Sequence, residues 1–100
     1  MQGFMVRTLA GRDVKIVNVC DPELLGRVIN DSGFQMNISR EYFDGELAST
    51  QDVIELVRNS DVANLVGKRI VDLVLEAGMA SGEAVRVVGG TAFLMIYKFS

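Results

Sequence analysis

The sequence contains no histidine, only one cysteine and only one proline. Without histidine, the usual zinc sites and the serine or cysteine nucleophiles that depend on an imidazole base are excluded. A single cysteine excludes an internal disulfide. No apolar run approaches the roughly 20 residues that a membrane-spanning helix needs. The first residues lack the pattern of a signal peptide. We therefore expect a cytoplasmic protein without a membrane segment.

Hydrophobic residues make up 49% of the 100 residues, which is enough material for the core of one domain spanning residues 1–100. The net charge of −3 is not typical of a general nucleic-acid-binding domain, which is usually basic. Composition therefore predicts one small globular domain and leaves its partner open.

The first half of the chain predicts strands around a short helix. Residues 4–9 and 14–19 are apolar-rich runs separated by a turn, and they predict a β-hairpin whose second strand lies inside a sheet. Asp21, Pro22 and Glu23 are typical of a helix start. Residues 34–38 alternate between apolar and polar and predict a third strand. The buried stripe that we expect for the short helix consists of Leu24, Leu25, Val28 and Ile29.

The second half predicts two helices and a hairpin. A turn region at residues 40–46 precedes a helix over residues 51–59, capped by Ser49 or Thr50. The apolar pattern then predicts a long, mostly buried helix over residues 64–77. Strands at residues 84–88 and 92–99 are joined by a double-glycine turn. This order favours an α+β two-layer sandwich, with a mixed or mostly antiparallel sheet and helices packed on one face.

The best candidate binding site is an anion site built from two segments. Asn64 as helix cap would place Lys68 and Arg69 near free amides at the positive end of the long helix. Gly67 in the first helical turn indicates close approach of another backbone segment. The Gly89-Gly90 turn could add amides that point at an anion. The alternatives are a solvated basic face and an ordinary hairpin turn.

Other candidate positions have simpler structural explanations beside their functional ones. Cys20 ends an apolar strand and is typical of a small buried hydrophobe, with a reactive thiol as the alternative. Acidic residues such as Asp21 and Glu46 have ready roles in caps and turns, so they predict no catalytic pair. Tyr42 and Tyr97 are the aromatic residues that we expect to be partly exposed. No calcium-loop spacing is present, and we predict no metal and no cofactor.

Four segments together are similar to a known family. VNVCDPELLGR, REYFDGE, DVANLVGKRIVDLVLEAG and VRVVGG, in this order, resemble an archaeal family catalogued as domain of unknown function 424. The resemblance implies an α+β fold and an archaeal source and brings no activity with it. The family has proline and histidine after the double glycine, and this chain has neither there. The candidate positions that the resemblance implies are Cys20, Asp21, Gly26, Tyr42, Gly45, Glu46, Asn64, Gly67, Arg69, Gly89 and Gly90.

Three function hypotheses follow from the sequence. The leading one is a non-enzymatic binding module for RNA, a ribonucleoprotein or another anionic ligand, with its site at Asn64, Lys68, Arg69 and the double-glycine turn. The second is a protein-interaction or homodimerising domain that offers its apolar C-terminal strand as a sheet edge. The third is an enzyme that binds a small molecule or nucleotide. Without histidine, acid–base catalysis near neutral pH is harder, which favours a binding role.

Overall fold

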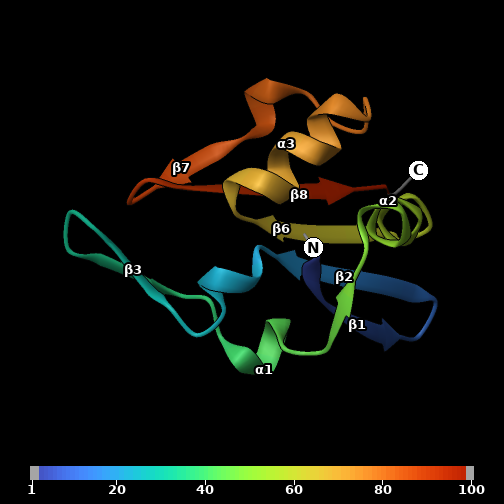
Figure 1. Ribbon diagram of the computed structural model, residues 1–100, viewed down its shortest axis with the longest axis horizontal. Coiled ribbons are helices and arrows are strands. Elements are labelled where there is room, and N and C mark those ends of the chain that lie inside the picture. Colours follow the sequence, from blue (N-terminus) through green and yellow to red (C-terminus); the bar gives the residue numbers. More distant parts are fainter. Residues whose placement is uncertain (1–2, 99–100) are drawn as a thin grey trace.

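A six-stranded β-sheet forms the centre of the protein in the computed structural model, which describes residues 3–98 (Figure 1). Its strand order is β5-β1-β2-β6-β8-β7, and all neighbours are antiparallel except β2 and β6. The strands are β1 (Phe4–Gly11), β2 (Val14–Cys20), β5 (Glu46–Ala48), β6 (Val62–Val66), β7 (Arg86–Val88) and β8 (Thr91–Tyr97). A separate two-stranded sheet pairs β3 (Val28–Asp31) with β4 (Phe34–Asn37).

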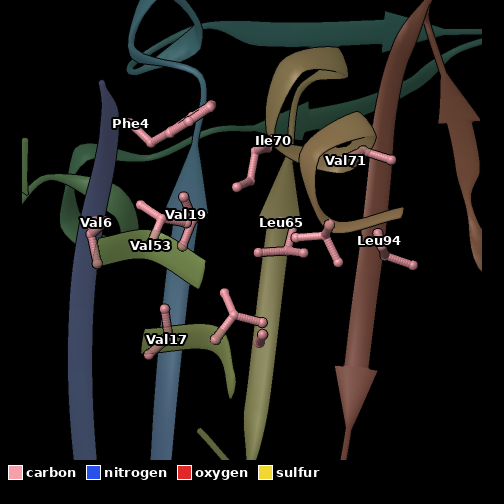
Figure 2. Close-up of a cluster of buried hydrophobic side chains, with 12 residues drawn as sticks. Phe4, Val6, Val17, Val19, Val53, Leu65, Ile70, Val71 and Leu94 are labelled. Carbon is pink, nitrogen blue, oxygen red and sulfur yellow. The ribbon is translucent and has the colours of Figure 1, made fainter. Parts of the chain in front are cut away.

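Two helices cover one face of the six-stranded sheet. Helix α2 (Thr50–Arg58) and helix α3 (Lys68–Glu76) bury apolar side chains against β1, β2, β6 and β8, as Figure 2 shows. Alternate strand residues point to this face, because successive side chains of a strand point to opposite sides. The predicted α+β class and two-layer arrangement are confirmed. The buried core consists of Phe4, Val6, Val17, Val19, Val53, Val57, Ala63, Leu65, Ile70, Val71, Val74 and Leu94.

The opposite face, which we call the second face, is covered only in part. A smaller cluster of Cys20, Ile38 and Val66 is buried there, and Phe43 packs against it. Phe43 belongs to the short helix α1 (Arg40–Phe43), which Ser39 caps by accepting a hydrogen bond from the amide of Glu41. The predicted turn region therefore contains one helical turn. The β3–β4 hairpin projects beside the turn between β7 and β8 (Figure 1).

The expected helix after Asp21 is wrong. Only a single 3-10 turn forms at Pro22–Leu24, and Val28 and Ile29 lie in β3. The turn ends at Leu25, whose backbone is extended (φ −60°, ψ 126°), and Gly26 follows with a φ of 84°. The Gly26 amide then donates to the carbonyl of Ile38, which draws the chain into the β3–β4 pair.

The expected long helix over residues 64–77 is also wrong in its first third. Val62–Val66 forms strand β6 between β2 and β8, and the helix begins only at Lys68. Gly67 has φ 122° and ψ 151°, a conformation that is not helical and that essentially only glycine adopts. The β-branched and apolar run before it fits an inner strand, which is buried on both faces. Asn64 is therefore a strand residue and not a helix cap.

The remaining predictions agree with the structure in most respects. The first hairpin pairs Met5 with Cys20 through Gly11 with Val14. Helix α2 has the predicted cap, because Ser49 Oγ accepts from the amide of Asp52. The predicted strand at residues 84–88 is shortened to Arg86–Val88 by a 3-10 turn at Gly82–Ala84.

The C-terminal strand and its hairpin with the preceding strand are confirmed, but part of the sheet edge that it was expected to offer is covered. Strand β8 lies between β6 and β7 and not at the edge. The edge that the protein-interaction hypothesis required is thus covered by β7 along Thr91–Phe93. Phe99, the predicted last residue of the strand, lies outside the described residues.

Candidate functional site

The first turn of α3 is capped by a carboxylate from a distant part of the chain. Asp21 accepts hydrogen bonds from the backbone amides of Arg69 and Ile70, each at 3.0 Å, and its own exposed fraction is only 3%. A Cβ atom on Gly67 would lie 2.4 Å from Asp21 Cγ, which explains the glycine. A close approach is present at Gly67, but the approaching group is the side chain of Asp21 and not the predicted backbone segment. The amides that the sequence hypothesis assigned to an external anion are occupied by Asp21.

The two cations of this turn are also matched by acidic side chains. Lys68 Nζ lies 2.7 Å from Asp72, and this hydrogen bond raises the pKa of the exposed lysine. Arg69 lies 3.0 Å from Glu23 and sits over the ring of Phe4 at 5.3 Å from its centroid. The start of α3 is therefore a structural joint, in which Asp21 and Glu23 tie the first turn of this helix to the turn after β2.

The double-glycine turn lies against the β3–β4 hairpin. The amide of Gly89 donates to Asp31 Oδ2 at 3.0 Å. A Cβ atom on Gly89 would meet the side chain of Ile29 at 2.6 Å and the carbonyl of Asn30 at 2.7 Å. Both Gly89 and Gly90 have positive φ, so the hairpin turn is confirmed. The contacts of this turn serve to hold β3 beside β7.

The secondary candidates Cys20, Tyr42 and Glu46 have different surroundings. Cys20 is fully buried, and burial raises the pKa of its thiol to about 12, with further contributions from Asp21 and other nearby acids. A thiol with that pKa is not a nucleophile at neutral pH. Tyr42 has an exposed ring, and its carbonyl oxygen accepts from Asn18. Glu46 is exposed on edge strand β5.

The second face carries a groove that the sequence did not reveal. It has a volume of about 650 Å³ and lies between β6, β7 and β8 on one side and the β3–β4 hairpin on the other. Three phenylalanines from separate elements line it: Phe34 from β4, Phe43 from α1 and Phe93 from β8. Because Asn64 was assigned to a helix, no pattern in the chain placed these residues together.

A chain of side-chain amides crosses the second face and ends at the groove. Asn18 Nδ2 donates to the carbonyl of Tyr42 at 2.9 Å, and Asn64 Nδ2 donates to Asn18 Oδ1 at 2.7 Å. Asn18 and Asn64 are directly paired across β2 and β6. Asn64 lines the groove, and its buried Oδ1 has no hydrogen-bond partner within the described part of the chain. Such an atom costs free energy unless something donates to it.

Arg86 supplies a positive charge to the same groove. It lies on β7 opposite Phe93, it is exposed, and it lines the groove. In contrast to Lys68 and Arg69, it has no carboxylate partner among residues 3–98. An apolar groove lined by two asparagines, Asn37 and Asn64, and by one unpaired cation is a typical small-ligand site, since few polar groups suffice to orient a ligand.

Among residues 3–98, no group of three or more cysteine and acidic side chains is placed to hold a metal ion. Within the same range, no helix has the length and apolar character required to cross a membrane.

Fold and groove together define a small α+β protein that packs two helices on one sheet face and carries a groove on the other. The chain belongs to the family described as "Protein of unknown function (DUF424)", whose model matches residues 10–99. The family resemblance is thereby confirmed.

One similar solved structure is described as an uncharacterized conserved protein from Methanopyrus kandleri. It has a TM-score of 0.80 and 20% sequence identity, covering 95% of this chain and 90% of that chain. At this identity the likeness shows the fold alone. Comparison with curated proteins gave no match.

Proposed function

We propose that this protein is a binding module that holds an unstacked base of single-stranded RNA in the groove of its second face. The observation that carries this proposal is the meeting of three phenylalanines, a side-chain amide and an unpaired arginine around one groove of about 650 Å³. Proteins that read single-stranded RNA stack splayed-out bases on aromatic rings and hydrogen-bond to their edges.

Each group in the groove has a role in this proposal. Phe34 is 56% exposed on the hairpin and offers a ring face to a base, while Phe93 lies across the groove on β8. Asn64 can bond to the edge of the base. Arg86 is placed on the exposed side and can neutralise a backbone phosphate.

The groove suits an anionic ligand better than the start of α3. At α3 the amides are taken by Asp21, and both cations already face acidic side chains. The RNA hypothesis from the sequence therefore keeps its ligand class, and its site moves to the groove. Asn64 is the one residue that belongs to both versions.

The acidic net charge limits how RNA can bind. With a net charge of −3, the protein does not attract a long stretch of backbone, and base stacking has to supply most of the affinity. If one phosphate is neutralised by Arg86, the log–log slope of affinity against salt should be about −0.7. A slope this shallow would distinguish binding of a base in the groove from binding of the RNA backbone to a basic surface.

The test is fluorescence anisotropy with short single-stranded RNAs of one base each, titrated with nuclease-treated protein across a salt series. Phe34→Ala should weaken binding by about 5- to 150-fold, the range expected for loss of one stacked base. Arg86→Gln should remove most of the salt dependence. Both residues are exposed, so the fold should survive either change.

Two control variants are matched to these changes. Leu47→Ala removes an exposed apolar side chain from β5, and Arg58→Gln removes an exposed arginine from α2. Neither residue lines the groove, and neither change should affect affinity. Absence of binding at low salt, or equal affinity for the Phe34→Ala and Leu47→Ala variants, would refute the proposal.

A further inference from the structure

We infer that the ligand in the groove presents a hydrogen-bond donor to Asn64 Oδ1, so that the groove selects bases with a free N–H group at their edge. This inference rests on the proposed binding of a base in the groove. It adds which chemical group the base must carry, and it follows from the direction of the hydrogen bonds behind Asn64.

The direction of the amide chain is set at its buried end. The carbonyl oxygen of Tyr42 can only accept a hydrogen bond, so the side chain of Asn18 must turn its NH₂ group toward it. This leaves Asn18 Oδ1 facing Asn64. Asn64 must then donate with its own NH₂ group, as the 2.7 Å contact shows.

The free atom of Asn64 is therefore its oxygen, and it can only accept. An asparagine with a free amide group could flip to suit either a donor or an acceptor. Here a flip would bring two oxygens together at the Asn18 contact and lose that bond. The amide at the end of the chain is thus held in one orientation, which is what discrimination between donor and acceptor requires.

We expect Met95 to be the side chain that moves when a ligand reaches this oxygen. It lies directly opposite Asn64 on β8, lines the groove and is 50% exposed. Asn64 Oδ1 itself is covered in the structure. Methionine is unbranched and has three rotatable bonds, so its displacement costs little compared with a branched side chain. An incoming N–H group gives the buried oxygen the partner that it lacks.

The donors that fit are the ring N–H of uracil and guanine and the amino groups of adenine, cytosine and guanine. One N–H of the Asn64 NH₂ group is held by Asn18, and Asn64 Oδ1 is the atom without a partner among the described residues. A base whose only donor is methylated should leave Asn64 Oδ1 unpaired. A ligand that bonds only as an acceptor should be rejected in the same way.

The test compares RNAs that differ only in methyl groups on the base. The full chain is titrated with oligouridine and with the same oligonucleotide carrying N3-methyluridine, which lacks the ring donor. The matched control is 5-methyluridine, which adds a methyl group of the same size and keeps the donor. The same comparison is made for oligoadenosine, with N6,N6-dimethyladenosine as the base without a donor and 2-methyladenosine as its control.

For each base that binds, we expect removal of the donor to weaken binding by about 5- to 150-fold and the control methyl group to leave it unchanged. Asn64→Ala should bring the methylated and unmethylated RNAs to equal affinity. Should that variant fail to fold, the comparison on the unchanged protein still decides the point.

Two results would overturn the inference, and they differ in what they imply. If the protein binds RNAs with and without the donor equally well, the donor requirement is wrong while base binding stands. If no RNA binds at low salt, the proposed function itself is wrong, and the inference falls with it.

Discussion

Replacing Asp21 with alanine should destabilise the protein far more than loss of an ordinary helix cap. Asp21 is 3% exposed, and its carboxylate oxygens accept from two consecutive amides in the first turn of α3. It also joins the end of β2 to a helix that lies 48 residues later in the chain. The change therefore removes a cap and a long-range contact together.

The expected magnitude follows from these two parts. Loss of an N-terminal cap costs about 1 kcal/mol in the free energy of unfolding. The amide of Ile70 is buried and would be left without a partner, which adds about 1–3 kcal/mol. We expect a total loss of about 2–4 kcal/mol, a large fraction of the stability of a domain of this size.

The assay is urea denaturation followed by circular dichroism, with Ser49→Ala as the matched control. Ser49 lies directly before α2 and caps this helix through one hydrogen bond. Its hydroxyl oxygen accepts from the amide of Asp52 at 3.2 Å, in an exposed part of the chain. Its loss should cost about 1 kcal/mol. If Asp21→Ala costs no more than Ser49→Ala, the view of Asp21 as a structural joint is wrong.

The same residue gives a prediction about pH. Burial raises the pKa of Asp21 above its ordinary value of 3.8, although the amides of Arg69 and Ile70 and the charge of Arg69 act against this. The folded protein then holds the proton more tightly than the unfolded chain. The stabilisation that comes from this tighter proton binding at Asp21 is fully present below pH 3.8. It is lost as the pH rises through the raised pKa. Asp21→Asn, which does not titrate, should lack this change, and identical pH profiles would contradict it.

Two further predictions concern Gly67 and Cys20. Gly67→Ala should lower the free energy of unfolding by about 3 kcal/mol, because it adds a Cβ 2.4 Å from Asp21 Cγ at a φ of 122°. Gly82→Ala, with nothing within 4 Å and ordinary φ, should change it by less than about 0.5 kcal/mol; equal melting of the two variants in urea would contradict the steric argument. Cys20, buried and with a pKa of about 12, should not react with a disulfide reagent at neutral pH until urea unfolds the chain, when one thiol should appear. A fast reaction of the native protein would show that the thiol is accessible.

Local patterns in the chain were sufficient for several elements. The first hairpin follows from two apolar runs and a short turn, and α2 follows from Ser49 and an amphipathic repeat. Such signals can be read from sequence because the residues that produce them are neighbours in the chain. The turn at Gly89 and Gly90 belongs to the same group.

The predictions from the sequence are wrong where a local pattern fits two different structures. Val62–Val66 is apolar and is continuous in pattern with the helix that follows, so periodicity alone could not separate strand from helix. Only its position between β2 and β8 decides in favour of the strand. Likewise the sequence predicts that Asp21 caps the helix next to it, which is wrong, because its side chain makes no cap hydrogen bond there. The amides that it accepts from belong to α3.

The sequence by itself determined the fold class, the family, the first hairpin and α2, because composition and local periodicity carry that information. Only the tertiary structure decided that Asp21 closes the start of α3 and that Asn64 lies on a strand. It alone brought Phe34, Phe43, Phe93 and Arg86 around one groove. The physical reason is that a groove is made by strand order and register, and the pairing of β6 with β2 and β8 depends on contacts that no local segment contains.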